Sequence, residues 1–259
     1  MRVLANSFIP KRHKNLLINF SGISLAHGTN VYLPQTMPLI SHRGAAHLGA
    51  ANSKNAVLSG DAYHPAYIEI DINSTSDGVL VVHHGELSRF LRGKNMKDTY
   101  EQAKNKIPHL LTLDEFLLIQ VKSPCIYDIK ILGKDALGDI IQALSRQKRE
   151  DFAFTSPHSD ALAVMQNAFP GSFVFQSQPY HHGPIAALEL ARKHKFNGIA
   201  LNKWWLTPLV YNLCKLHGKK IMVYTIDQTW WLKLAHLFFP GAYIVTNRPD
   251  LYRELFPEE

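Results

Sequence analysis

Residues 198–226 read GIALNKWWLTPLVYNLCKLHGKKIMVYTI and contain one complete strand–helix–strand unit. This segment begins and ends with short runs of apolar and β-branched residues, which are typical of buried strands. Between these runs, Thr207 can cap a helix, Pro208 fits its first turn, and Gly218 can end it. Two strands joined by a crossover helix of this kind are expected to be parallel.

The same alternation extends over most of the chain. From residue 125 onward, apolar runs begin about every 20 to 27 residues, and two more lie upstream. The eight expected strands are Leu39–His42, Tyr67–Ile72, Cys125–Ile129, Phe152–Thr155, Phe173–Gln176, Gly198–Leu201, Lys220–Ile226 and Ala242–Thr246. They predict an α/β fold, a single (β/α)8 TIM barrel over residues 37–259, preceded by an N-terminal extension of residues 1–36. Val79–His84 follows the expected strand Tyr67–Ile72 too closely to run parallel beside it. We therefore expect these two strands to form a β-hairpin over the barrel mouth.

Composition narrows the classes of function. The chain has 259 residues, of which 46% are hydrophobic and 19% charged, and this excludes intrinsic disorder. The net charge of +7 favours anionic partners. Because the basic residues are scattered and no nucleic-acid motif is present, we expect no nucleic-acid partner. No apolar run is long enough for a transmembrane segment, and a cytoplasmic location is expected, with secretion left open. The oligomeric state is not predicted.

Acidic side chains stand at the carboxyl ends of two expected strands, where barrel enzymes carry their active sites. Glu69 and Asp71 are two residues apart and therefore share one face of their strand, and Asp128 ends the next barrel strand. Three converging carboxylates make an oxygen-rich site for a hard divalent cation, Mg²⁺ or Ca²⁺. Burying like charges together without a cation is costly, which favours a metal site over a salt-bridged core.

Histidines and cationic side chains surround these carboxylates. His42 and His84 end separate expected strands, followed or flanked by Arg43 and Lys130. Such a set suits phosphodiester cleavage, because cations neutralise charge on phosphoryl oxygens and imidazoles transfer protons. His83 points to the other side of its ribbon from His84.

Several motifs, taken in order over residues 38 to 250, resemble the glycerophosphodiester phosphodiesterase family. They are His42-Arg43-Gly44, Glu69-Ile70-Asp71, the turn Ser76-Asp77-Gly78, Val81-Val82-His83-His84, Thr112-Leu113-Asp114-Glu115, Tyr127-Asp128-Ile129-Lys130, Tyr224-Thr225-Ile226 and Thr246-Asn247-Arg248-Pro249. The resemblance implies an enzyme of lipid or glycerol metabolism that hydrolyses glycerophosphodiesters to glycerol 3-phosphate and an alcohol, using a divalent metal. It also implies a small-molecule or lysolipid phosphodiester as substrate. By position, it makes His42 and His84 catalytic, Glu69, Asp71 and Asp128 metal ligands, and Arg43 and Lys130 phosphate-binding residues.

The sequence departs from the family pattern in ways that leave two alternatives open. Ser53-Lys54-Asn55-Ala56 stands for the usual Pro-Glu-Asn-Thr, His84-Gly85 for His-Asp, and Asp128-Ile129-Lys130 for Glu-x-Lys. One alternative is a phospholipase D- or C-like activity on a lysophospholipid or phosphoinositide. The other is a catalytically silent barrel that binds a phosphorylated ligand.

Residues near the mouth carry two further expectations, and one question about the histidines stays open. Trp204 and Trp205 are read equally as packing or as a rim that makes a peripheral contact with a lipid or head group. Asp227 is expected to cap the helix that contains Trp230 and Trp231. Which histidine acts as acid and which as base is left open.

Overall fold

The computed structural model describes residues 37–85, 96–131, 133–178 and 182–257. The expected N-terminal extension, residues 1–36, lies outside these residues, and its assignment stays a prediction. Within the described part, both cysteines are buried and free. None of the described helices combines the length and the apolar character needed to cross a membrane.

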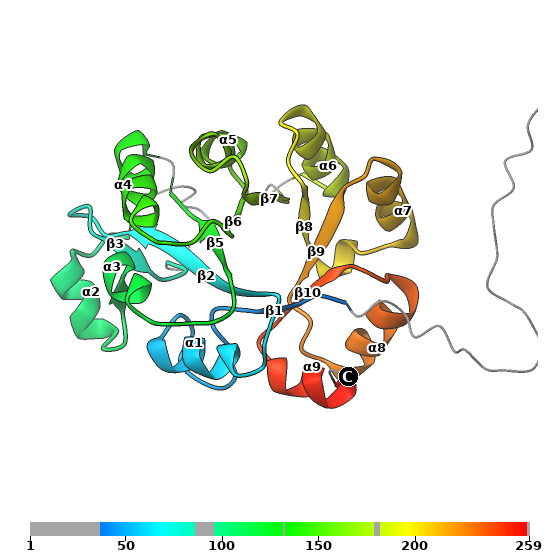
Figure 1. Ribbon diagram of the computed structural model, residues 1–259, viewed down its shortest axis with the longest axis horizontal. Coiled ribbons are helices and arrows are strands. Elements are labelled where there is room, and N and C mark those ends of the chain that lie inside the picture. Colours follow the sequence, from blue (N-terminus) through cyan, green and yellow to red (C-terminus); the bar gives the residue numbers. More distant parts are fainter. Residues whose placement is uncertain (1–36, 86–95, 132, 179–181, 258–259) are drawn as a thin grey trace, which may run out of the picture. The chain divides into compact units, whose positions relative to one another are not determined.

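Eight parallel strands close into a barrel, as predicted (Figure 1). Closure is made by the first strand, which pairs with the second on one side and with the last on the other, with Ile40 beside Tyr67 and Val245. The barrel strands are β1 (Leu39–Ser41), β2 (Tyr67–Ser74), β5 (Cys125–Ile129), β6 (Ala153–Ser156), β7 (Phe173–Ser177), β8 (Gly198–Asn202), β9 (Lys220–Tyr224) and β10 (Tyr243–Thr246).

Helices surround the barrel on its outside (Figure 1). They are α1 (Lys54–Asp61), α4 (Lys134–Ser145), α5 (Ser159–Ala168), α6 (Pro184–Lys193), α7 (Pro208–Leu216), α8 (Thr229–Phe238) and α9 (Pro249–Leu255), with a 3-10 turn, η1 (Lys203–Trp205), after β8. The Thr207 side chain accepts a hydrogen bond from the Val210 amide, which confirms the expected cap of α7. The expected cap of α8 is wrong, because its N-cap residue is Gln228 and no side chain caps it.

The predicted hairpin is present beside the barrel. Strand β3 (Leu80–Val82) runs antiparallel to the end of β2, with Val82 opposite Ile72. A two-residue strand that was not predicted, β4 (Leu111–Thr112), pairs with β3. Helix α2 (Tyr100–Lys106) precedes β4, and α3 (Leu113–Leu117) follows it with a capping box formed by Thr112 and Glu115. The hairpin carries the residues after β3 back toward the end of β2, where the His83 amide donates to the Asp71 carbonyl.

The interior of the barrel changes from apolar to polar along each strand. A buried cluster drawn from the strands fills the lower interior: Ile40, Ile126, Ala153, Phe175, Ala200, Met222 and Val245. Residues two positions further along five of these strands face the same interior. These side chains are polar and line a cavity at the mouth: His42, Asp128, Thr155, Ser177 and Tyr224. A second, larger core packs the helices against the outside of the strands.

Candidate active site

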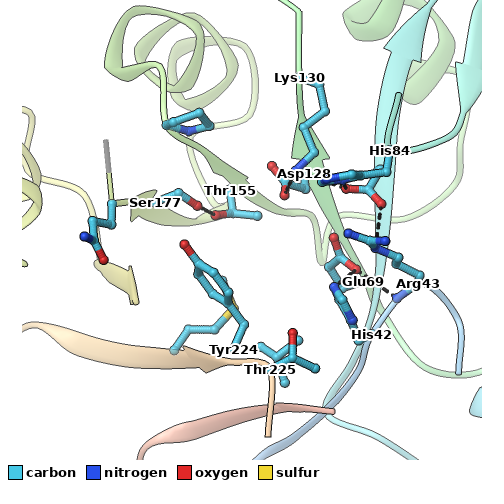
Figure 2. Close-up of a pocket in the computed structure, with 15 residues that line it drawn as sticks. His42, Arg43, Glu69, His84, Asp128, Lys130, Thr155, Ser177, Tyr224 and Thr225 are labelled. Atoms are coloured by element: carbon cyan, nitrogen blue, oxygen red, sulfur yellow. Dashed lines mark hydrogen bonds and ion pairs between the residues drawn. The ribbon is translucent and has the colours of Figure 1, made fainter. Parts of the chain in front are cut away.

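A cavity of about 270 Å³ opens at the carboxyl ends of the barrel strands. Figure 2 shows charged side chains on one side of it and Tyr224, Thr155 and Ser177 on the other. The structure brings together all seven residues that the sequence nominated: His42, Arg43, Glu69, Asp71, His84, Asp128 and Lys130. His83 does not line this cavity, and its Nδ1 instead accepts a hydrogen bond from the Gly85 amide.

Three carboxylates form the centre of the charged side. Glu69, Asp71 and Asp128 each offer an oxygen within 4.8 Å of the others. The sheet register explains this arrangement, because Asp71 lies directly beside Asp128 on the neighbouring strand and Glu69 lies two residues earlier on the same face. Glu69 and Asp71 are buried, so their charges are largely removed from bulk water.

Two cationic side chains offset part of this negative charge. Lys130 Nζ contacts Asp128 Oδ2 and lies 3.1 Å from Asp71 Oδ1, while Arg43 Nε lies 3.2 Å from Asp71 Oδ2. The Arg43 amide also donates a 2.8 Å hydrogen bond to Glu69 Oε2. Three ionised carboxylates against two cations leave one negative charge uncompensated in a buried place, which is unfavourable without a further cation.

The pKa values of Glu69 and Asp71 are shifted in opposite directions by this imbalance of charge. Burial, reinforced by the negative charges of Asp71 and Asp128, raises the pKa of Glu69 well above its usual range. Burial also opposes ionisation of Asp71, but Lys130, the hydrogen bond from His84 and Arg43 hold the pKa of Asp71 well below its usual range. Ionising all three carboxylates therefore needs a positive charge beyond those of Arg43 and Lys130.

The donor set fits a hard divalent cation. It offers carboxylate oxygens only, the ligand type that Mg²⁺ and Ca²⁺ prefer. Asp128 Oδ1 is buried and has no hydrogen-bond partner in the described part of the protein. A buried polar atom without a partner is costly, and a bound cation would supply one.

His42 is held by a chain of side chains that the sequence did not reveal. Its Nδ1 lies 2.7 Å from Asn247 Oδ1, and Asn247 Nδ2 donates a 2.7 Å hydrogen bond to Asp227 Oδ2. Asp227 Oδ1 also accepts from the Thr246 hydroxyl and the Asn247 amide. Both carboxylate oxygens of Asp227 thus accept hydrogen bonds from the end of β10 and the loop after it, and for this reason Asp227 does not cap α8.

This chain of contacts fixes the tautomer of His42. A carboxylate can only accept, so Asp227 requires the NH₂ group of Asn247 to face it and turns the Asn247 oxygen toward His42. His42 Nδ1 must then carry the hydrogen, which leaves the lone pair on Nε2, 3.9 Å from Glu69 Oε2. Burial and the nearby Arg43 guanidinium lower the pKa of His42 to about 4, so its ring is neutral at pH 7 in the absence of a bound ion.

His84 contacts the carboxylate cluster directly. Its Nδ1 lies 3.0 Å from Asp71 Oδ1, and Figure 2 shows its ring across the cluster from His42. The residue after it departs from the family pattern for a local reason. Gly85 has φ of 85°, and a Cβ built there would lie 2.6 Å from the side-chain nitrogen Nδ2 of Asn73. A side chain at this position would require Asn73 to move.

Asn52 is a further site residue that the sequence did not nominate. Its Nδ2 donates to Asp71 Oδ2 at 2.9 Å and its Oδ1 accepts from the Asp71 amide. Ser53 follows as the N-cap of α1, whereas Lys54 is exposed and does not line the active-site cavity. Of the two nearby asparagines, Asn52 and not Asn55 therefore bonds the carboxylate cluster. The match of Ser53-Lys54-Asn55-Ala56 to Pro-Glu-Asn-Thr stays a prediction.

The fold and the site together define a (β/α)8-barrel enzyme of the phosphoric diester hydrolase class. A family model described as the glycerophosphoryl diester phosphodiesterase family matches residues 42–130, which contain all seven nominated residues. Residues 42–130 of the chain are thus similar to the glycerophosphodiester phosphodiesterase family. No relative is found among the curated proteins.

Several solved structures share the fold of this chain. A glycerophosphodiester phosphodiesterase from Parabacteroides distasonis is 20% identical, with a TM-score of 0.69 over 86% of this chain and 97% of that one. One from Thermotoga maritima is 18% identical, with a TM-score of 0.67 over 85% and 99%. A phosphodiesterase from Oleispira antarctica, solved in complex with the product sn-glycerol-3-phosphate, is 18% identical, with a TM-score of 0.71 over 88% and 98%. At these identities the likeness shows the fold.

Proposed function

We propose that this protein hydrolyses glycerophosphodiesters to glycerol 3-phosphate and an alcohol, with Mg²⁺ or Ca²⁺ as cofactor. The observation that carries the proposal is the gathering of three carboxylates, two histidines and two cationic side chains around one cavity. The family match supports the substrate class. The product held by the Oleispira antarctica phosphodiesterase is of the same chemistry.

Glu69, Asp71 and Asp128 would hold the cation. When bound, it would neutralise charge that builds on the non-bridging phosphoryl oxygens. Arg43 and Lys130 lie beside the same carboxylates and would take up the remaining charge of the phosphodiester. The positive side chains thus serve first to balance the carboxylates and then to orient the phosphoryl group.

The two histidines would divide the proton transfers. His42 presents the lone pair of Nε2 and would take a proton from the attacking hydroxyl, which belongs to water or to the substrate's own glycerol. In the second case the first product is a cyclic phosphodiester, which water then opens to glycerol 3-phosphate. As the new P–O bond forms, the bond to the leaving alcohol breaks. His84, whose ring is paired with the Asp71 carboxylate, would give its proton to the departing alkoxide. The tautomer imposed by Asn247 is what favours His42 as the base.

A panel of substrates and metal ions tests the proposal. We expect purified protein to release glycerol 3-phosphate from soluble glycerophosphocholine with Mg²⁺ or Ca²⁺ and not without them. Lysophosphatidylcholine micelles and phosphoinositides in the same panel test the phospholipase-like alternative. No turnover of any substrate, with calorimetric binding of glycerophosphocholine, would support the silent barrel and refute the proposed function.

Asn247 is expected to act as a positioning residue for His42. Because Asn247→Ala removes the acceptor that fixes the tautomer, we expect kcat to fall by about 10- to 100-fold with little change in KM. Asn55→Ala, at an exposed position on α1, is the matched control. Nitrogen NMR of the His42 ring adds a second measurement, in which the variant should lose the Nδ1-protonated signature. An unchanged ring signature with unchanged kcat would refute this role.

A further inference from the structure

All four tryptophans of the chain lie in two segments that follow neighbouring strands of the barrel, at its mouth. Trp204 and Trp205 form η1, directly after β8, and Trp230 and Trp231 form the first turn of α8, shortly after β9. We call these four residues the tryptophan rim. In Figure 1 the two segments follow adjacent barrel strands, and neither contributes to the lining of the active-site cavity.

The rim is held in place although it is exposed. The rings of Trp204 and Trp231 meet edge to face at 5.8 Å, and those of Trp230 and Trp231 lie 4.9 Å apart. Lys203 Nζ lies over the Trp204 ring and donates a hydrogen bond to Gln228, which joins the two loops. Even so, Trp204 is 69% exposed, Trp205 47% and Trp230 54%. Large aromatic side chains fixed in solvent mark a surface that is covered in another state.

The apolar surface continues away from the rim. Along α8, Trp230, Leu234, Leu237 and Phe238 are all exposed. Their spacing of i, i+4, i+7 and i+8 places them on one face of the helix, opposite the buried Leu232 and Ala235. Leu209, at the mouth end of α7, is exposed as well. Among the described residues, helix α8 therefore has two apolar faces, of which one packs on the barrel and the other is exposed.

The charge of this region is strongly one-sided. Residues 190–249 contain nine lysines and arginines and a single acidic residue, Asp227. This stretch carries a net charge of +8, more than the +7 of the whole chain. The one acidic residue, Asp227, is hydrogen-bonded to Thr246 and Asn247. Lys203 directly precedes Trp204 of the rim, and Lys233 lies on α8. Arg248 is paired with Asp250, just after this stretch, so Lys203 and Lys233 are the positive charges that stand among the exposed apolar side chains.

We propose that the tryptophan rim and the outer face of α8 bind the surface of an anionic lipid bilayer. Tryptophan prefers the boundary between head groups and acyl chains, and leucine and phenylalanine beside it gain by insertion. Each lysine near an anionic bilayer adds electrostatic attraction. A second copy of the chain is a poorer occupant, because two such faces would bring their positive charges together.

Vesicle binding tests this proposal directly, since the tryptophans that report on the surface are the only ones in the protein. Full-length protein is titrated with vesicles of phosphatidylcholine alone and of phosphatidylcholine with an equal part of phosphatidylglycerol. We expect a blue shift of the emission and co-sedimentation with the anionic vesicles, both weakened by added salt. Vesicles of phosphatidylcholine alone should bind at least roughly tenfold less protein.

Two matched variants separate charge from apolar insertion. The double charge reversal Lys203→Glu/Lys233→Glu should weaken binding at least roughly tenfold. Lys134→Glu/Lys148→Glu, at exposed positions on and after α4, changes the net charge equally and should have little effect. Trp204→Ala should also weaken binding, whereas Leu118→Ala, at an exposed position after α3, should not.

The outcome does not depend on the proposed function, because binding is measured without substrate. Protein that stays in the supernatant with anionic vesicles, while circular dichroism shows it folded, would overturn the proposal. Equal loss of binding in the two charge-reversal variants would also overturn it. So would a concentration-dependent dimer whose tryptophan emission ignores lipid. Vesicle binding by a protein without phosphodiesterase activity would leave this proposal standing and refute only the proposed function.

Discussion

Replacing His42 with alanine is expected to lower kcat for glycerophosphodiester hydrolysis by about 10²- to 10⁴-fold, the usual contribution of a general acid or base. The neutral ring, oriented by Asn247, presents Nε2 to the cavity, and alanine offers no proton acceptor there. His84→Ala should cause a loss of similar size. The double variant should lose little more than either single one, because the two histidines act in the same step. Steady-state kinetics with saturating divalent cation measure these effects.

Two other histidines provide matched controls. His47, exposed and close in sequence to His42, and His83, beside His84 but outside the cavity, should each tolerate alanine with nearly full activity. Thermal unfolding of every variant checks that the barrel is intact. If His42→Ala kept more than about a tenth of the activity, the acid–base mechanism would be wrong.

The barrel and the charged half of the site could be predicted because both depend on local patterns. A buried strand requires a run of apolar residues, and each of the eight runs marks one strand. Residues two apart on a strand share a face, so Glu69 and Asp71 had to converge once the fold was recognised. Strand β4 could not be predicted, because the two residues Leu111 and Thr112 are too few to show any periodicity.

The supporting residues could not be predicted because their roles arise from contacts between distant segments. Asp227 precedes a helix, where an aspartate usually caps, but its oxygens bond the loop after β10. Asn247 meets His42 across 205 positions of sequence. Asn52 has φ of 62°, a backbone conformation that Asn tolerates, and this places its amide on Asp71. Spacing alone could not show that Asn52, and not Asn55, bonds Asp71.

The second large effect is expected from the cation site. Treatment with EDTA should abolish activity, and Mg²⁺ or Ca²⁺ should restore it, because the three carboxylates carry more negative charge than Arg43 and Lys130 balance. Added cation should also raise the melting temperature of the wild-type protein, since a ligand that binds only the folded state stabilises it. Unfolding followed by circular dichroism, with and without the ion, measures this increase.

Glu69→Gln separates the charge of the cluster from its shape. Glutamine can still accept the hydrogen bond from the Arg43 amide, and it is neutral without taking up a proton. Without cation, we expect this variant to be more stable than wild type by on the order of 1 kcal/mol, because Glu69 costs stability there either as a third buried negative charge or by taking up a proton. It should also lose most of its activity and most of its stabilisation by the cation. The matched control Glu189→Gln, at an exposed position on α6, should behave as wild type in both respects. A Glu69→Gln protein that is less stable without cation, yet fully active with it, would show that Glu69 serves the packing of the barrel and not a metal site.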